Sequence, residues 1–331
     1  MPTALKIFLI ICALLVVAFL LFFIGALILS KPPITNTYEV TEDFSGIYIN
    51  TLRSDIRILP TEESKAKVVC VENEARLHTV TISDGTLKIE EDTTSAWYDF
   101  ISPFPRKETV SLYLPYAEYG ALNVSALTSD VSIAENFSFE EINVAVSTGD
   151  VNNSASSKGD LSITATTGDV INNASAYGDL RITTTTGDVA LTNTNAKSLS
   201  LSLSTGTVSV SNASFNEAIC INVQTGDISL ADVSCASLNS SGTTGDILLT
   251  KTAVSGKLAI ERSTGDVKLN FSDAGEIEIV TGTGDVTGTL LTPKIFFTDT
   301  STGHVEVPKY SSANGTCTVT TSTGNIIFSV D

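Results

Sequence analysis

The sequence predicts an all-β protein whose main part is a right-handed parallel β-solenoid (β-helix) of about ten coils, and three observations support this. A Thr-Gly corner recurs ten times, from Gly149 to Gly324, with glycine spacings of 19, 19, 19, 20, 19, 20, 19, 19 and 21 residues. Apolar residues alternate with Ser, Thr and Asn on both sides of each corner, which is the period of a strand. Asp follows the glycine in seven of the ten copies. Such a regular repeat period is typical of a solenoid, in which each coil buries its row of apolar residues against the next coil.

The first element of the chain is an apolar segment. Residues 7–29 are uncharged and rich in Leu, Ile, Val and Phe. As a helix they would rise about 1.5 Å per residue and span a hydrocarbon core of about 30 Å. A cleaved signal peptide would have a shorter apolar region and a small-residue cleavage site, whereas this run ends in Ser30-Lys31-Pro32-Pro33.

We therefore expect an uncleaved signal anchor, a single transmembrane helix in the cell membrane. Residues 1–6 would be a cytoplasmic stub and residues 30–37 a linker, and the C-terminal part would lie outside the cytoplasm. The positive-inside rule slightly favours this orientation.

Residues 38–127 alternate like strands without a clean repeat, and we expect them to cap the solenoid. Leu52-Arg53-Ser54-Asp55 resembles a degenerate corner between two short strands. Asp84-Gly85 predicts a hairpin turn, and Val110–Leu114 predicts a strand that stops at Pro115. Trp97–Pro105 is an aromatic cluster with three interpretations: a binding loop, a cover for the open end of the core, or a mobile excursion.

Residues 128–331 hold the repeats, each a strand, a Thr-Gly corner, a second strand and a return. Glycine suits the corner because it reaches positive φ at little cost. The stacked aspartates have two interpretations. They would either accept turn hydrogen bonds or form a file that binds calcium, although the repeat lacks the denser glycine pattern of calcium solenoids. The last coil shows no obvious cap.

Composition and isolated residues give little sign of chemistry. The net charge is −18, which disfavours nucleic acid as a partner. The cysteines have no CxxC spacing or nearby histidine, which argues against zinc. Cys220 and Cys235 would either pair or fill space in the core. His78 and His304 lie far apart in the chain, outside any triad spacing, and Arg262 breaks the repeat pattern without forming a motif. We therefore predict no catalytic, cofactor-binding or metal-binding residues, and no enzyme.

The repeat, as in Leu161–Val170 and Leu180–Val189, resembles the DUF4097 family of bacterial proteins. Asp84–Ile89 and Val110–Pro115 are similar to the N-terminal segment of that family. The resemblance covers roughly residues 40–331 and implies a β-strand repeat fold. Members are described as candidate adhesins and are often linked to membranes, and some are associated with envelope stress.

Three functions follow as hypotheses. The first is a membrane-anchored, non-catalytic surface solenoid that acts as an adhesin or envelope-interaction module. The second is a structural scaffold or envelope-stress component that assembles through the solenoid ends, as a homo-oligomer. The third, ranked last, is a polysaccharide-active enzyme. The sequence names no cofactor, and the partner, whether cell wall, glycan or protein, is left open.

Overall fold

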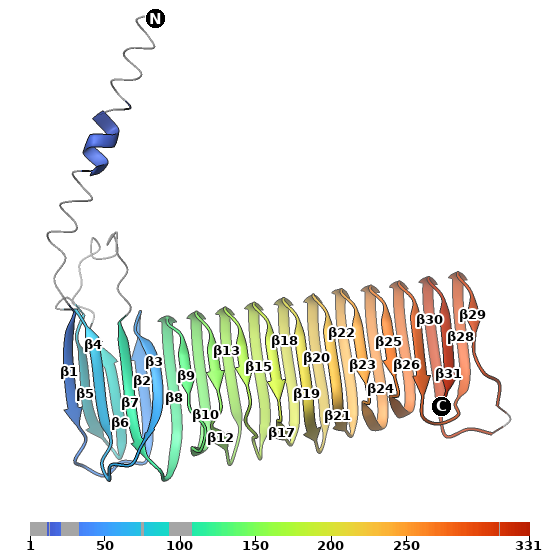
Figure 1. The fold of residues 1–331 in the computed structure, drawn as a ribbon. Helices are drawn as coiled ribbons and strands as arrows, with labels where there is room; N and C mark the ends of the chain where they lie inside the picture. The colour runs from blue at the N-terminus through green and yellow to red at the C-terminus, as the bar shows by residue number, and fades with distance from the viewer. Residues whose placement is uncertain (1–11, 13, 21–32, 74–75, 93–107, 311) are drawn as a thin grey trace, which may run out of the picture.

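The structure, a computed structural model, describes residues 12, 14–20, 33–73, 76–92, 108–310 and 312–331. Short β-strands stack into a long rod (Figure 1), and the predicted all-β solenoid is confirmed. Residues 14–20 are helical. No helix among the described residues is long and apolar enough to cross a membrane. Most of the expected anchor at residues 7–29 lies outside the described residues, as does the whole Trp97–Pro105 cluster.

The strands of the N-terminal third are β1 (Ile34–Glu39), β2 (Gly46–Thr51), β3 (Asp55–Thr61), β4 (Lys67–Glu72), β5 (His78–Ser83), β6 (Thr86–Glu91), β7 (Thr109–Pro115), β8 (Glu118–Thr128) and β9 (Val131–Ile133). The strands that follow are β10 (Ser138–Thr148), β11 (Val151–Asn153), β12 (Ser156–Ser157), β13 (Leu161–Thr167), β14 (Val170–Asn172), β15 (Asp179–Thr186), β16 (Val189–Thr192), β17 (Asn195–Ala196), β18 (Ser198–Thr205), β19 (Val208–Phe215), β20 (Ala218–Thr225), β21 (Ile228–Cys235), β22 (Ser237–Thr244), β23 (Ile247–Thr250), β24 (Ala253–Thr264), β25 (Val267–Asn270), β26 (Asp273–Thr283), β27 (Val286–Leu290), β28 (Ile295–Thr302), β29 (Val305–Glu306), β30 (Thr316–Thr323) and β31 (Ile326–Val330).

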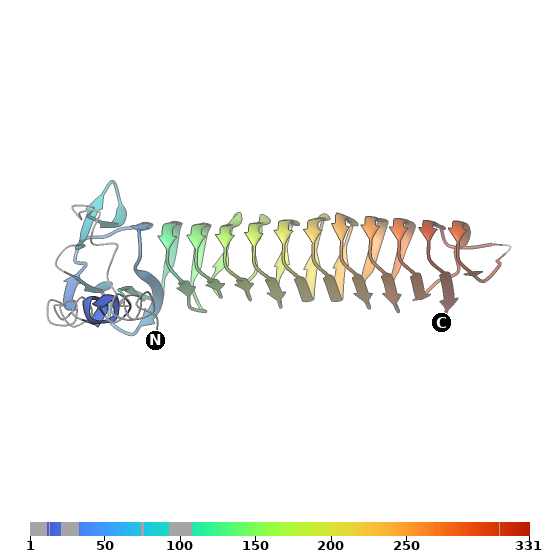
Figure 2. The ribbon, with the colours of Figure 1, turned by 90° about the horizontal axis from the view of Figure 1, so that it is seen from above.

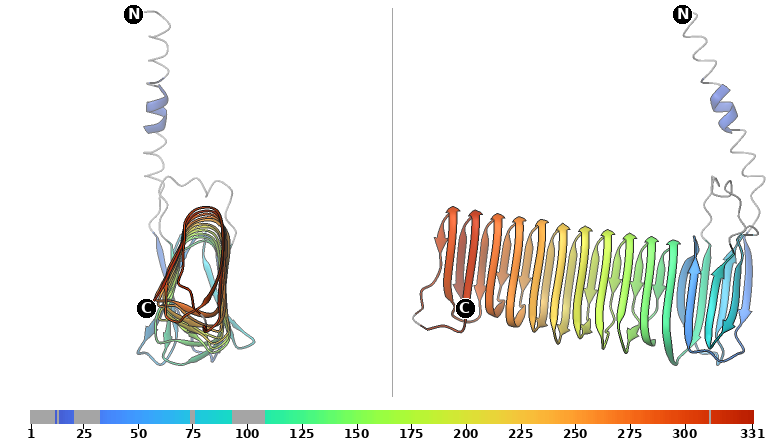
Figure 3. Two further views of the ribbon diagram at one scale, coloured as in Figure 1. Left: turned by 90° about the vertical axis from the view of Figure 1, so that its right-hand side faces the viewer. Right: turned by 180° about the vertical axis from the view of Figure 1, so that it is seen from behind.

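Each coil has two long sides, and the coils superpose as a flattened ring when the rod is seen along its axis (Figure 3, left). We call the sheet before the corners side A and the sheet after them side B. Side A contains β8, β10, β13, β15 and their successors in parallel register, and side B contains β9, β11, β14 and β16. Figure 2 shows the two sides running along the whole rod.

The core lies between these two sides. Alternate residues point inward, as in β18, where Leu199, Leu201 and Leu203 are buried while Ser202 is exposed. Identical positions stack on one another, so Leu201 of β18 pairs with Ile182 of β15 on one side and Ile221 of β20 on the other. The predicted burial pattern is therefore confirmed, and the core is continuous from coil to coil.

The corner glycines have φ values from 135° to 159°, a region that only glycine occupies readily. Side B bends a second time a few residues later. There Asn193, Asn212, Asp232, Lys251 and Phe271 have φ between 48° and 54°. Asn and Asp tolerate this left-handed conformation better than other side chains do.

The N-terminal third follows the predicted pattern closely. Residues 52–54 form a corner, because β2 pairs with β8 and β3 with β9 in parallel. Strands β5 and β6 form the predicted hairpin, with φ of 52° at Asp84 and 69° at Gly85. Strand β7 ends at Pro115. Strands β1, β4 and β5 run antiparallel to their neighbours at this end.

The order of coils differs from the order of the chain at both ends. The β2–β3 coil lies between the β6–β7 strands and the β8–β9 coil. Near the C-terminus, β30 pairs with β26 on one side and with β28 on the other, and β31 lies between β27 and β29. The outermost coil is therefore β28–β29 (Figure 1). The expectation that the last coil of the chain is uncapped was wrong, because an earlier coil covers it.

Candidate functional site

The outer surface of side A forms a long polar face. Two outward rows run along it from β2 to β22 and hold a single charged side chain, that of Arg181. The first row is Tyr48, Asn123, Asn143, Ser162, Arg181, Ser200, Cys220 and Asn239, and the second is Asn50, Ser125, Ala145, Thr164, Thr183, Ser202, Asn222 and Ser241. Strands repeat at about 4.8 Å, so these eight strands cover about 34 Å. We call these two rows the neutral face.

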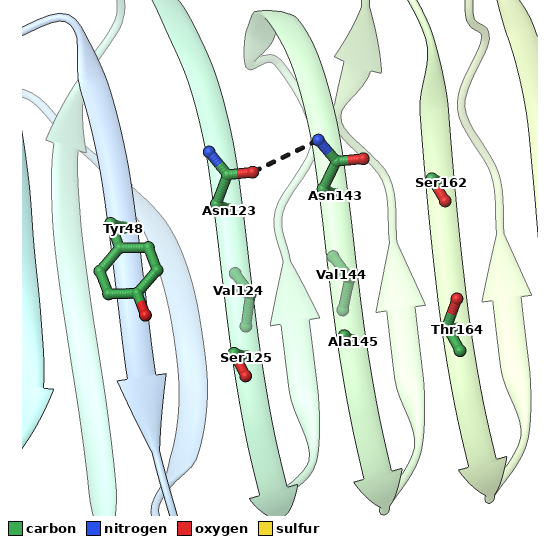
Figure 4. Close-up of a pocket in the computed structure, with 9 residues that line it drawn as sticks. All are labelled: Tyr48, Asn123, Val124, Ser125, Asn143, Val144, Ala145, Ser162 and Thr164. Atoms are coloured by element: carbon green, nitrogen blue, oxygen red, sulfur yellow. Dashed lines mark hydrogen bonds between the residues drawn. The ribbon is translucent and has the colours of Figure 1, made fainter.

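A shallow groove of about 250 Å³ lies at the N-terminal end of the neutral face. Figure 4 shows Tyr48 on β2, Asn123 on β8 and Asn143 on β10, in this order across three neighbouring strands. The Asn143 side-chain nitrogen donates to Glu141 Oε1 at 2.9 Å and to Asn123 Oδ1 at 3.3 Å. Hydroxyls of Ser125, Ser162 and Thr164 complete the polar lining. The groove therefore combines one aromatic ring with amides and hydroxyls that both donate and accept hydrogen bonds.

The corners of the rod carry a ladder of hydrogen bonds. In each step the backbone N–H of the residue after the corner glycine, or after Ser129 in the first of these corners, donates to Oδ1 of the equivalent residue in the neighbouring coil, at 2.7 to 3.2 Å. The acceptors are Asp55, Asp130, Asp150, Asp169, Asp188, Asp227, Asp246, Asp266, Asp285 and Asn325. The interpretation of these aspartates as turn acceptors is confirmed, with the difference that each bond links two coils.

A buried polar cluster lies between β4 and β5. The exposed fractions are 0% for Cys70, 0% for Glu72 and 3% for His78. Glu72 Oε2 lies 2.7 Å from His78 Nδ1 and also accepts the His78 backbone N–H at 2.7 Å. Ser54 Oγ lies 3.3 Å from His78 Nε2, and Asn36 donates to Glu72 Oε1 at 2.5 Å. Burial, and then the charge of Glu72, raise the pKa of the Cys70 thiol to about 12.

Ser54, His78 and Glu72 share the hydrogen-bond order of a Ser–His–acid triad. Ser54 is 0% exposed, however, and so is Glu72. A substrate cannot reach a nucleophile that is buried in this way, so the geometry supports a structural arrangement and not hydrolysis.

A second polar group packs next to this cluster. Arg76 Nη2 donates to Glu108 Oε1 at 3.0 Å, and Asn73 donates to the same oxygen. Burial raises the pKa of Glu108, and Arg76 opposes that shift. Glu91 Oε2 accepts the backbone N–H of Leu52 at 2.6 Å. The N-terminal end of the rod therefore buries several carboxyl groups.

Other residues singled out by the sequence do not gather into a site. Arg262 is 2% exposed and donates from Nη1 to the Val223 carbonyl at 2.7 Å. It lies over Gly242, where an added Cβ would fall 1.8 Å from Arg262 Nη1. Thr207 and His304 continue the corner ladder through their N–H groups, and the His304 ring also lies 3.9 Å from Glu306 Oε2. The two histidines lie in β5 and beside β29, at opposite ends of the rod (Figure 1).

The described cysteines are all free. Cys235 is buried in the core whereas Cys220 is exposed on the neutral face. The space-filling interpretation is therefore confirmed for Cys235 and wrong for Cys220. Sequence reasoning also missed the meeting of Cys70 and His78. The available signal was the parity of β4, which places Glu72 on the same buried face as Val68 and Cys70.

Comparisons with solved structures find chains of low sequence identity. A candidate adhesin from Bacteroides fragilis NCTC 9343 is 16% identical, with 90% of this chain and 98% of that chain covered and a TM-score of 0.37. A candidate lipid-binding protein from Parabacteroides distasonis ATCC 8503 is 14% identical, with 88% and 96% covered and a TM-score of 0.41. A candidate adhesin from the same organism is 12% identical, with 88% and 98% covered and a TM-score of 0.40.

No curated protein matches this chain. The family described as Toastrack DUF4097 matches residues 44–194 and 171–328. These two matches together take in nearly all of the rod, including the first corner and the outermost coil. The chain therefore belongs to the DUF4097 (Toastrack) family.

Proposed function

We propose that this chain is a membrane-anchored, non-catalytic rod that binds uncharged polymers, such as glycans, outside the cytoplasm and acts as an adhesin. The neutral face carries this proposal. The protein as a whole has a net charge of −18, yet the two outward rows from β2 to β22 hold one charged side chain. A ligand with hydroxyl and amide groups would meet matching donors and acceptors there without having to neutralise charge.

The groove at the end of this face gives the ligand an anchoring point. An aromatic ring offers a large apolar surface together with a polar tip, which suits the mixed faces of a sugar ring. Asn123 lies on the strand next to Tyr48 and Asn143 on the strand after it, and both amides carry donors and acceptors. The rigid register of β2, β8 and β10 holds these groups at fixed separations, so little conformational entropy is lost on binding.

The anchor is supported by the uncharged run at residues 7–29. In the proposed arrangement this run holds the protein in the cell membrane, with the rod outside the cytoplasm. Extraction of membranes at alkaline pH and protease treatment of intact cells test this part separately. A protein that is released by alkali, or that stays intact under external protease while permeabilised cells lose it, contradicts the anchored surface arrangement.

The binding function is tested with the full-length protein in lipid nanodiscs on an array of neutral and charged glycans and cell-wall polymers. We expect binding to uncharged polymers, and at least tenfold weaker binding for Tyr48→Ala and Asn143→Ala, since one lost contact of about 1.4 kcal/mol has that effect. Asn152→Ala, an exposed change on side B, is the matched control and should bind as the wild type does. Binding that survives both groove substitutions, or binding to charged polymers only, contradicts the proposal.

A further inference from the structure

The Cys70–Glu72–His78 cluster offers the ligand set of a thiophilic metal ion. The Sγ of Cys70, a carboxylate oxygen of Glu72 and a ring nitrogen of His78 all lie within 4.8 Å of one another. Zinc binds sulfur at about 2.3 Å and nitrogen or oxygen at about 2.0 to 2.2 Å, which places tetrahedral ligand atoms about 3.3 to 3.7 Å apart. Shifts of about 1 Å or less in these side chains would bring all three atoms to one ion.

The surroundings of the cluster match those of a metal centre. A ligating histidine usually has its second nitrogen bound to a fixed partner, and ligating carboxylates are hydrogen-bonded in turn. Here Ser54 Oγ lies 3.3 Å from His78 Nε2. Asn36 holds Oε1 of Glu72 at 2.5 Å, which leaves Oε2 on the side of the imidazole. Both potential ligands are therefore oriented by groups outside the triplet.

Charge gives a separate reason for a cation. Glu72 is fully buried, and none of the described lysines or arginines forms an ion pair with it. Its side-chain partners are the Asn36 amide and the imidazole of His78, and the imidazole offsets the charge of the carboxylate only when it is protonated. Beside a neutral imidazole, a buried carboxylate without a compensating charge is costly. One divalent cation bound to a carboxylate, a thiolate and a neutral imidazole would give a buried cluster with no net charge.

The cluster lies where a crosslink would have a structural effect. Cys70 and Glu72 belong to β4, which pairs with β1 and β7 on side B. His78 begins β5, which pairs with β6 on side A. Among the described residues, the paired registers join β4 to β1 and β7 and join β5 to β6, and a single backbone bridge between Asn73 and Arg76 lies between β4 and β5. An ion held by both strands would join the two sides of the flattened coil at the N-terminal end of the core.

We propose that Cys70, Glu72 and His78 form a binding site for a thiophilic divalent cation, with zinc as the best fit, that fastens β4 to β5 and closes this end of the solenoid. Thiolate and imidazole ligands favour zinc over calcium or magnesium, which prefer oxygen. The role is structural, because all three residues are buried. The site is distinct from the neutral face and does not depend on the adhesin function.

The test uses full-length protein purified in detergent, stripped of metal and titrated with cobalt and then with zinc. Cobalt bound to a thiolate gives a sulfur-to-metal charge-transfer band that carboxylate and imidazole ligands alone do not give. We expect one metal per chain by elemental analysis, the charge-transfer band in the wild type, and a rise in Tm when zinc is added. Wild-type protein that shows no stoichiometric metal and no band overturns the proposal without any variant.

Variants assign the ligands. Cys70→Ser and His78→Gln should each lose the band, while Cys235→Ser, which removes another buried thiol far along the chain, should keep it. Asn36→Ala should retain the band but bind zinc about 10- to 100-fold more weakly, as outer-shell changes do. If a ligand variant fails to fold, the wild-type band and the Asn36→Ala affinity still decide. A band that persists in folded Cys70→Ser, or that disappears in Cys235→Ser, refutes the assignment.

Discussion

Replacing a corner glycine should locally unfold the rod, and Gly206→Ala is the clearest case. Gly206 has φ of 146°, a region that costs other residues about 1 to 3 kcal/mol. An added Cβ would lie 2.0 Å from the Gly187 carbonyl oxygen. Because real Cβ atoms stay at least 3.0 Å from such an atom, the two corners would have to separate by about 1 Å.

That separation would break the bonds between the two corners. They are Gly187 N–H to the Thr205 carbonyl at 3.1 Å, Val189 N–H to the Thr207 carbonyl at 2.9 Å, and Thr207 N–H to Asp188 Oδ1 at 2.8 Å. Each contributes about 1 kcal/mol net. Together with the backbone strain, the local cost is about 4 to 6 kcal/mol.

Hydrogen–deuterium exchange measures this cost where it arises, which matters because a stacked array can unfold in parts. A loss of about 4 kcal/mol or more corresponds to roughly 1,000-fold faster exchange or more at the amides of these two corners. Gly85→Ala is the matched control, since Gly85 has φ of 69° and nothing within 4 Å of an added Cβ. It should cost about 1 to 2 kcal/mol, or roughly tenfold in exchange. Equal effects of the two changes, or exchange near wild type in Gly206→Ala, would refute the steric argument.

Three further predictions concern single side chains. Thr207→Asp should raise the free energy of unfolding, measured in urea, by about 0.5 to 1 kcal/mol, because the new carboxylate accepts a hydrogen bond from the next corner. Thr207→Ser should leave the free energy of unfolding unchanged. A gain in both variants would show that the ladder is not the cause. In native protein, iodoacetamide should modify Cys220 on the neutral face but not Cys70, Cys235 or Cys317, because burial raises the pKa of those three thiols to about 12. Mass spectrometry measures the rate of modification at each cysteine. Modification of the three buried thiols at the rate of Cys220 would count against the described core. Burial raises the pKa of Glu108, so the folded state binds the Glu108 proton more tightly than the unfolded state does. The stabilisation that this proton gives is present below about pH 4.3 and is lost as the pH rises through the folded-state pKa. In urea titrations the stability of Glu108→Gln relative to wild type should therefore improve with rising pH, and a pH-independent difference would contradict this.

Much of the fold follows from the sequence because one repeating pattern determines it. The Thr-Gly corner sets the turn, and the alternation around it sets which side chains are buried, as Leu199, Leu201 and Leu203 show. Even the imperfect corner at residues 52–54 was predictable, because its flanking strands keep the same parity.

The order of coils at the two ends was not predictable. Coils of similar pattern offer nearly equivalent pairing surfaces. Strand β28 could therefore have paired with β26, but β30 takes that position instead. The choice depends on connections that the pattern does not describe. The Cys70–Glu72–His78 cluster was missed for a related reason, because the antiparallel strands that bring His78 to Cys70 belong to the region without a repeat. The neutral face, in contrast, can be predicted from its rows of Ser, Thr and Asn once the register of the strands is known.

The displaced order of these two coils makes β28 and β29 depend on strands that are synthesised after them. During translation, Ile295–Glu306 emerges before Thr316–Val330, yet its strands lie outside the later ones and pair only with them among the described strands. A chain that ended at residue 315 would thus lack the partners that β28 and β29 have here, and these strands would have to pair elsewhere. Among the described strands, the outermost coil is therefore held by backbone hydrogen bonds from residues that follow it in the chain.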